Sequence, residues 1–209
     1  ITHRERIQAC LNGEAPDRTP IALWRHFPVD DQNPASLAAS TLHFQATYDF
    51  DIVKVTPASS FAVKDWGVDD QWMGDAEGSR RYTKRVINTP EDWEKLKPLD
   101  PTSPHLAGQL DCLRLLKKNL SSETPIIQTI FNPLSQAKNL AGNETLLAHL
   151  RQNPEAVMNG LDVIAKTTMK FIEAARDIGI DGIFYAIQHA QAEIMDLDEY
   201  KTFALPYDQ

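Results

Sequence analysis

Four short apolar runs alternate with stretches of helical periodicity along the 209 residues of this chain. Strands that alternate with helices are typical of βα units, which build a parallel sheet. Four such units correspond to about half of a (β/α)8 barrel, or TIM barrel, a fold of roughly 250 residues. We therefore predict an α/β protein, a single domain over residues 1–209 that covers the first half of such a barrel. The four runs are Thr19–Trp24, Asp51–Thr56, Thr124–Phe131 and Asp181–Ile187.

A five-stranded open sheet is the alternative architecture. Half of a barrel leaves an unpaired parallel strand at each edge, which is unfavourable in a sheet. We therefore expect the polypeptide to be part of a longer chain. Residues 60–88 interrupt the alternation, because they lack helical periodicity. There, Gly74 and Gly78 precede the strand-like residues Tyr82–Ile87, which indicates a β-hairpin excursion.

Helix boundaries are marked by capping residues. Thr2 and Glu5 have the spacing of a capping box. Asn153 and Pro154 open the longest amphipathic stretch, and Gly179 ends it. The helices predicted in this way begin at Thr2, Pro34, Thr89, Pro104, Asn143, Asn153 and Asp196.

Charge and hydropathy exclude two classes of partner. The formal net charge of −8 argues against nucleic-acid binding, which needs a basic stripe. No apolar run approaches the roughly 18 residues of a membrane span, and the amino terminus lacks a signal-peptide pattern. A short basic cluster is interpreted as a solvated hairpin edge that could still help to hold an acidic substrate. It consists of Arg80, Arg81, Lys84 and Arg85.

The two cysteines, Cys10 and Cys112, lie in helix-like surroundings without the spacing of a metal site. We expect both to be buried structural thiols. No disulfide framework is indicated, so a cytoplasmic location is expected.

Polar side chains follow the first apolar run at its carboxyl end, where parallel α/β enzymes build active sites. Arg25 is suited to bind a substrate carboxylate or phosphate; a salt bridge with Asp30 or Asp31 is the alternative. His26 is a candidate acid or base or a candidate metal ligand; a hydrogen-bonded structural role is the alternative. Asp31 is a candidate for binding polar substrate or metal, although acids also stabilise helix starts such as the one at Pro34.

Two further positions carry candidate residues. Lys54 lies inside the second run, where a lysine is costly unless it points to a cavity or a partner. It could bind an anion or act as a base, or pair with Asp51 on the outer face. Gln188 and His189 follow the fourth run, again at the expected catalytic edge.

Several stretches resemble, in their sequence and in their order along the chain, those of the uroporphyrinogen decarboxylase superfamily. This group includes the decarboxylase of haem biosynthesis and zinc-dependent methyltransferases that work with corrinoid proteins. Each stretch alone is a weak signal, whereas their joint order is fairly specific. The family fold is a (β/α)8 barrel, and the resemblance covers nearly the whole chain but only the front part of a family member. The stretches are Thr2–Gly13, Pro20–Arg25, Phe50–Val53, Thr89–Leu96, Gly182–Ala190 and Phe203–Tyr207.

The resemblance implies roles for individual residues. Arg25 stands where the decarboxylase binds substrate carboxylates, and His189 matches a histidine after its fourth strand. The decarboxylase's Asp stabilises a protonated pyrrole, and losing such a charge typically costs a few kcal/mol of barrier. Uroporphyrinogen decarboxylation is therefore disfavoured. The family's second Arg, essential Asp, active-site Tyr and Ser fall at Val29, near Ala58, near Asn139 and at Gln188.

The resemblance thus favours a divergent, methyltransferase-like enzyme acting on a small anionic molecule. Arg25, Gln188 and Asp31 would bind the substrate, and His189 with His26 or Lys54 would handle protons. No cofactor is identifiable in this chain and no metal ligand is assigned within it; zinc would be held by residues beyond Gln209. A corrinoid protein is the implied methyl partner, and a homodimer is expected. Genuine uroporphyrinogen decarboxylase and a non-catalytic small-molecule-binding barrel are the alternatives.

Overall fold

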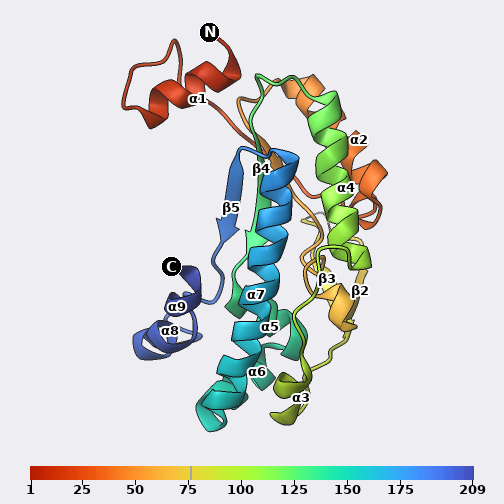
Figure 1. Cartoon of the computed structure of the whole chain (residues 1–209), viewed down its shortest axis with the longest axis vertical. Helices are drawn as coiled ribbons and strands as arrows, with labels where there is room; N and C mark the ends of the chain where they lie inside the picture. Colours follow the sequence, from red (N-terminus) through yellow and green to blue (C-terminus); the bar gives the residue numbers. More distant parts are fainter. Residues whose placement is uncertain (76) are drawn as a thin grey trace.

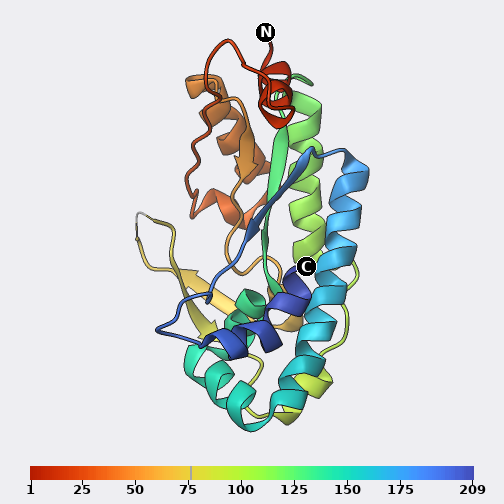
Figure 2. The same cartoon turned by 90° about the vertical axis from the view of Figure 1, so that its left-hand side faces the viewer.

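A parallel sheet with helices on one face forms the centre of the molecule (Figures 1 and 2). The computed structural model describes residues 1–75 and 77–209. The strands are β1 (Val53–Val55), β2 (Asp69–Trp72), β3 (Arg80–Lys84), β4 (Ile126–Phe131) and β5 (Gly182–Ala186). The helices are α1 (His3–Leu11), α2 (Pro34–Tyr48), α3 (Glu91–Lys95), α4 (Pro104–Asn119), α5 (Pro133–Ala141), α6 (Asn143–Gln152), α7 (Pro154–Ile178), α8 (Leu197–Phe203) and α9 (Leu205–Asp208).

The parallel sheet has the strand order β1-β4-β5, with Val53 opposite Ile126 and Ile127 opposite Gly182. Its covered face packs on α2, α4 and α7, of which α4 and α7 lie side by side along the strands in Figure 2. This apolar layer contains Val53, Val55, Ile126, Ile130, Leu106, Leu110 and Phe171. Because successive strand residues point to opposite faces, the residue between Val53 and Val55 points away from the helices. The opposite face therefore carries a different set of side chains.

The prediction of a buried first strand at Thr19–Trp24 is wrong. Residues 20–27 are extended, but they form no strand in the described structure. A single backbone hydrogen bond, from Asp51 N–H to the Ile21 carbonyl, ties this segment to the start of β1. Ile21 and Leu23 are 52% and 62% exposed. The apolar composition therefore correctly indicated an extended backbone at these residues. Burial of their side chains would also require backbone hydrogen bonds to a neighbouring strand along the whole segment.

Most of the remaining elements agree with the predictions. The capping box of Thr2 and Glu5 is present, and Gly179 ends α7 with φ of +93°. The excursion over residues 60–88 contains the antiparallel hairpin β2–β3, in which Asp70 is opposite Tyr82. The helix α5, directly after β4, was not predicted. No helix in the described residues is both long enough and apolar enough to cross a membrane.

The two cysteines differ in burial. Cys112 on α4 is fully buried, and burial raises the pKa of its thiol to about 12. Cys10 on α1 is exposed, so the expectation that both thiols are buried is wrong for Cys10. It lies on α1 near the amino end of the sheet, and Arg6 is the one residue of this helix that is buried.

A second apolar core lies beyond the carboxyl end of the sheet, where α3, α5, α6 and α7 meet. Trp93 is fully buried in it, and its indole N–H donates to His149 Nδ1 at 3.1 Å. A Cβ at Gly160 would overlap the Trp93 ring, so α7 approaches this ring through a glycine. The core holds the base of the hairpin and the start of α7 in place.

Asp51, two residues before β1, organises the amino end of the sheet. Its side chain is 1% exposed and accepts hydrogen bonds from Arg6 Nη1 at 2.6 Å and Arg18 Nη1 at 2.6 Å. His3 Nδ1 lies 2.8 Å away, and the Ile21 N–H donates at 2.7 Å. Burial favours the neutral acid, but these donors hold the pKa of Asp51 far below its ordinary value.

We expect Asp51→Asn to lower the free energy of unfolding by about 1.5–3 kcal/mol, because it removes the charge from the carboxylate that Arg6 and Arg18 share, while Arg6 keeps its ion pair with Asp17. Denaturant unfolding of the full-length protein measures this change. Asp49→Asn is the matched control, since Asp49 is 82% exposed and contacts only His3 of the same group; its effect should stay within about 1 kcal/mol. Equal losses in the two variants would contradict the role given to Asp51.

Candidate functional site

The carboxyl ends of β1, β4 and β5 lie at the same edge of the sheet, as parallel pairing requires. Several side-chain atoms buried in or near this edge have no hydrogen-bond partner among the described residues. Enzymes of this fold class use this edge for binding and catalysis. The atoms include Asp31 Oδ2, Thr56 Oγ1, Ser60 Oγ, Asp70 Oδ2, Asn139 Oδ1 and His189 Nδ1.

Lys54 points from the middle of β1 to the face that lacks helices. Its Nζ lies 4.3 Å from the ring centroid of Trp24 and 4.1 Å from that of Phe184. No carboxylate of the described residues forms a salt bridge with it, and burial lowers its pKa to about 8. The two rings stabilise the ammonium group through cation–π contacts. Lys54 is therefore a half-buried cation with aromatic walls and no fixed counter-charge.

His26 lies on the same side of the extended segment as Trp24, since side chains two residues apart point the same way. It is half-buried and packs against Gly78 at the hairpin tip, where a Cβ would overlap it. Burial first, and then the charge of Lys54, lowers the pKa of His26. Its imidazole is therefore mostly neutral at neutral pH and can accept a proton.

Arg25 points the other way, for the same geometric reason. Its guanidinium lies over the Phe27 ring at 5.4 Å and borders a groove along α2, which includes His43 and Tyr48. Neither Asp30 nor Asp31 pairs with it in the described structure, because Asp30 accepts from Ser40 and Asp31 faces the hairpin. The structure thus brings His26 and Lys54 together and leaves Arg25 apart from them.

Asp31 belongs to a buried charged group at the base of the hairpin. Arg80 Nε donates to Asp70 Oδ1 at 2.7 Å, and Arg80 Nη1 lies 3.6 Å from Asp31 Oδ1. Lys64 Nζ lies 3.5 Å from Asp70 Oδ1. The Arg80 side chain is 5% exposed, so the interpretation of the basic cluster as a solvated edge is wrong for this residue. Two carboxylates and two cations balance each other here.

The two carboxylates of this group differ in acidity. Burial raises the pKa of Asp31, although Gln32 and Arg80 oppose the shift. Burial would raise the pKa of Asp70 as well, but the hydrogen bond from Arg80 and the charges of Lys64 and Arg80 outweigh it and hold the value below its ordinary range. Asp31 is therefore the carboxyl group of the pair that protonates first as the pH falls.

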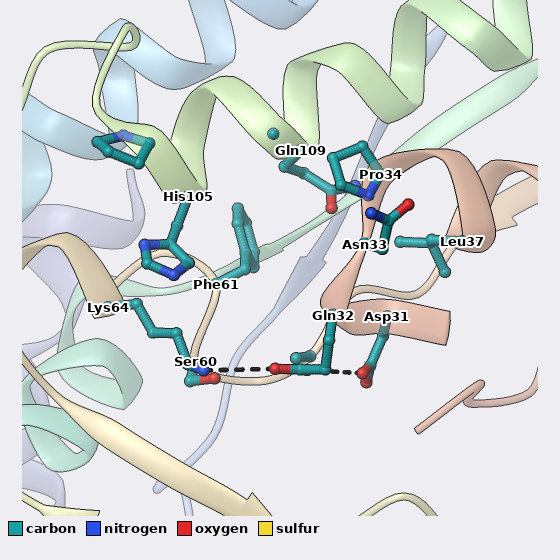
Figure 3. Close-up of a pocket in the computed structure, with 13 residues that line it drawn as sticks. Asp31, Gln32, Asn33, Pro34, Leu37, Ser60, Phe61, Lys64, His105 and Gln109 are labelled. Atoms are coloured by element: carbon teal, nitrogen blue, oxygen red, sulfur yellow. Dashed lines mark hydrogen bonds between the residues drawn. The ribbon is translucent and has the colours of Figure 1, made fainter. Parts of the chain in front are cut away.

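A cavity of about 150 Å³ opens beside Asp31, between the starts of α2 and α4 (Figure 3). Figure 3 shows a chain of contacts along one wall, in which Lys64 Nζ donates to Gln32 Oε1 at 3.3 Å and Gln32 Nε2 donates to Asp31 at 2.7 Å. Ser60 lies next to this chain, and its hydroxyl has no partner among the described residues. Apolar groups such as Phe61 form the opposite wall. The cavity suits a small molecule with both polar and apolar parts.

Gln188 and His189, the two candidates after the fourth apolar run, lie in different environments. Gln188 is exposed and makes no side-chain hydrogen bond with the described residues. His189 is half-buried with φ of +68°, and its Nε2 lies 3.2 Å from Asn143 Oδ1. Burial and then the charge of Lys138 lower the pKa of His189. It lies near the start of α6, and no contact joins it to His26 or Lys54.

Zinc does not fit the described residues. They contain no group of three or more His, Cys, Asp or Glu side chains arranged to hold a metal ion. Cys10 lies near the amino end of the sheet and Cys112 is buried in the helix layer, so neither lies near His26 or His189. The prediction that no metal ligand comes from this part of the chain stays a prediction.

Sequence reasoning missed the partners that define both polar groups. The apolar pattern predicts Trp24 as part of a buried strand, and no local sequence pattern pairs Asp70 with Arg80. One signal was available for the hairpin pair, since Asp70 and Arg80 lie on strands of the predicted hairpin. The contact of Lys54 with Phe184 joins residues from β1 and β5 across β4, and nothing in the local sequence indicates it.

Comparisons with known proteins agree with this architecture. The sequence model of the family described as "Uroporphyrinogen decarboxylase (URO-D)" matches residues 2–209. Two relatives named methylcobamide:CoM methyltransferase MtbA, from Methanosarcina acetivorans and Methanosarcina mazei, are 24% and 22% identical over the whole chain. The chain spans 65% of the length of each.

A solved structure of a methyltransferase from Methanosarcina mazei matches with a TM-score of 0.79 at 17% identity. The match covers 97% of this chain and 64% of that one. At this identity the likeness concerns the fold. The predicted α/β fold, with a parallel sheet that forms part of a TIM barrel, is confirmed.

We expect the amine of Lys54 to react with an amine-directed reagent half-maximally near pH 8, because its buried ammonium group loses a proton more readily than a solvated one. Mass spectrometry of the labelled full-length protein over a pH series measures this midpoint. The peptide that contains the exposed Lys118 corrects for the reagent's own pH dependence. A midpoint for Lys54 near the ordinary lysine value of about 10.4 would contradict the described burial.

Proposed function

The chain belongs to the uroporphyrinogen decarboxylase (URO-D) family, and from this premise we propose that it is part of a methyltransferase acting on a small anionic molecule. Two relatives that match over the whole chain are named as methyltransferases that use a methylcobamide and CoM. Methyl transfer from a corrinoid-bound methyl group to a small thiol is therefore the proposed reaction. A corrinoid protein would be the methyl partner.

One observation carries the proposal for this chain's own residues: Lys54, on the open face of the sheet, is a cation that has no fixed counter-charge among residues 1–75 and 77–209. Such a group would gain an ion pair when an anion binds, and a half-buried setting strengthens that pair. The rings of Trp24 and Phe184 would pack against the apolar part of the same molecule. We propose that Lys54 holds the anionic end of the substrate.

Proton handling follows from the position of His26. Transfer of a methyl group to a thiol releases the thiol proton, so a base must accept it. The imidazole of His26, with its lowered pKa, is available as that base beside Lys54. His189 would act at a separate point of the same edge, where it can orient the ligand.

Other parts of the proposal concern groups outside this chain. In this reaction class, zinc activates a thiol by stabilising the thiolate. Because the described residues do not supply its ligands, we derive no step through zinc and propose that it is held elsewhere in the protein. A homodimer is also proposed, and the sedimentation of the full-length protein tests it.

Decarboxylation of a tetrapyrrole is a second candidate, favoured by one observation. Asp31 lines the same cavity as Ala58, the position nearest to the family's missing Asp. The carboxylate of Asp31, just before α2, would then take the role of the family's Asp, which is expected in the loop after β1. Assaying carbon dioxide release from uroporphyrinogen beside methyl transfer decides between the two reactions.

We expect Lys54→Met to lower kcat/KM for methyl transfer from a methylcobamide to CoM by about 10- to 100-fold, since a charge-assisted contact contributes about 1.5–3 kcal/mol. Mass spectrometry of the methylated thiol gives the rates. Lys54→Arg should retain most of the activity, and Lys118→Met, on the outer face of α4, should retain all of it. Wild-type protein that forms no methylated thiol under these conditions would rule out this reaction.

The affinity for the anionic substrate should fall as the pH rises through about 8, because only protonated Lys54 attracts it. Above that pH, each further unit should weaken binding by up to about tenfold. Isothermal titration calorimetry over a pH series measures this loss. In Lys54→Arg the guanidinium stays charged, so the loss near pH 8 should disappear; the same pH profile in both proteins would contradict the role of Lys54.

A further inference from the structure

A second group of positive charges lies at the carboxyl edge, apart from Lys54. It consists of Arg85, directly after β3, and Lys138 on α5, with His189 beside them. Arg85 Nη1 donates to the carbonyls of Lys138 and Asn139 at 3.0 and 2.8 Å. The Arg85 guanidinium also lies over the Tyr82 ring at 4.7 Å. The end of the hairpin and the end of α5 thus present two cations side by side.

These cations have no counter-charge in the described part of the chain. Neither Arg85 nor Lys138 forms a salt bridge there, and the Lys138 ammonium makes no hydrogen bond with a described residue. Burial lowers the pKa of Arg85, and burial together with the charge of Arg85 lowers the pKa of Lys138. Half-buried like charges repel each other and are costly to keep together without an anion. In a chain of net charge −8, an uncompensated pair of this kind indicates a ligand.

The start of α6 adds hydrogen-bond donors at the same place. Gly142 precedes this ten-residue helix with φ of +93°, and no side chain caps the helix. The first backbone N–H groups of a helix have no partner within it, and they favour an anion. A Cβ at Gly142 would lie 3.2 Å from Arg85 Nε, and Asn143 contacts His189. The open helix start, Arg85 and His189 are therefore neighbours.

Two buried polar atoms without a partner among the described residues border these cations. His189 Nδ1 is buried and has no partner among the described residues. Asn139, which is 2% exposed, has an unpartnered Oδ1, and it follows Lys138 on α5. The carboxylate in the first turn of α6, Glu144, is exposed and forms no salt bridge with the described residues. The Asn139 oxygen can only accept, so the donors that remain for an anion are Arg85 Nε and Nη2, the Lys138 ammonium and the first backbone N–H groups of α6.

We propose that Arg85, Lys138 and the first turn of α6 form a binding site for a phosphate-like oxyanion, with His189 at its border. Arg85 presents a planar fork to two oxygens of the anion, and Lys138 adds a second positive charge. The backbone N–H groups of α6 complete the set of donors. This anion site depends on charge and geometry alone and not on the proposed methyl transfer.

Titration calorimetry of the full-length protein with inorganic phosphate at low ionic strength tests the site. We expect saturable binding in the wild type, weakened about tenfold or more in Lys138→Met, because one charge-assisted contact is lost. Lys138→Arg should bind within about threefold of the wild type. Lys118→Met is the matched control and should bind as the wild type does. Raising the salt concentration should weaken binding, since surface charge is screened.

Arg85→Met gives an independent measurement. Arg85 also bonds the end of α5, so its loss lowers stability as well as binding. The readout is therefore the rise in Tm that phosphate causes, compared between each variant and its own phosphate-free state. This rise should be present in the wild type and Lys118→Met and absent in Arg85→Met and Lys138→Met.

Free phosphate and the phosphate ester of a larger ligand share this chemistry. Methyl phosphate, titrated beside inorganic phosphate, distinguishes them: tighter binding of the ester assigns the site to a larger ligand, and tighter binding of phosphate assigns it to the free ion. Either order supports the site. Absence of saturable binding of both, or equal binding by the wild type and Lys138→Met, overturns it. Neither result depends on whether the protein transfers methyl groups.

Discussion

The buried carboxylate of Asp51 is the interaction on which the placement of the site depends. It joins α1, the loop before residue 20 and the start of β1 at the amino edge of the sheet. Two reciprocal contacts with Ile21 fix the register of the extended segment beside β1, since Asp51 N–H donates to the Ile21 carbonyl and the Ile21 N–H donates to the Asp51 carboxylate. Two parallel segments that start in register stay level with each other. Trp24 therefore arrives beside Lys54, each three residues further along.

The sequence predicted local features well and long-range partners poorly. Capping residues determine where helices start and end, so the bounds of α2 and α7 could be predicted from Pro34, Asn153 and Gly179. Burial depends on what the rest of the chain places nearby, and the apolar run at residues 19–24 therefore gave the wrong result. The helix α5 was missed because it is short and its polar residues, such as Gln136, are buried, so polar positions do not mark a solvent-facing side.

The candidate site shows the same division. Arg25 and His26 are adjacent in the sequence and were expected to act together, but neighbours on an extended segment point to opposite sides. His26 instead lies on the side of Lys54, which comes from β1, and Arg25 lies along α2. Asp31 was expected to bind substrate or start a helix, and the structure pairs it with Arg80, 49 residues away in the sequence. Ion pairs such as this one form because the hairpin lies over the edge of the sheet. Local sequence patterns do not indicate that position.

The two edges of the sheet differ in how completely their polar groups are paired. At the amino edge, Asp51 is surrounded by donors, and Asp181 accepts from Arg4 and from the Ile126 N–H at 2.8 Å. At the carboxyl edge, buried oxygens and cations lack partners among the described residues. A fold tolerates unpaired buried groups where they bind something, because leaving them unpaired costs about 1–3 kcal/mol each. The amino edge therefore maintains the fold, and the stability that it supplies allows the carboxyl edge to keep Lys54, Lys138 and Arg85 available for anions.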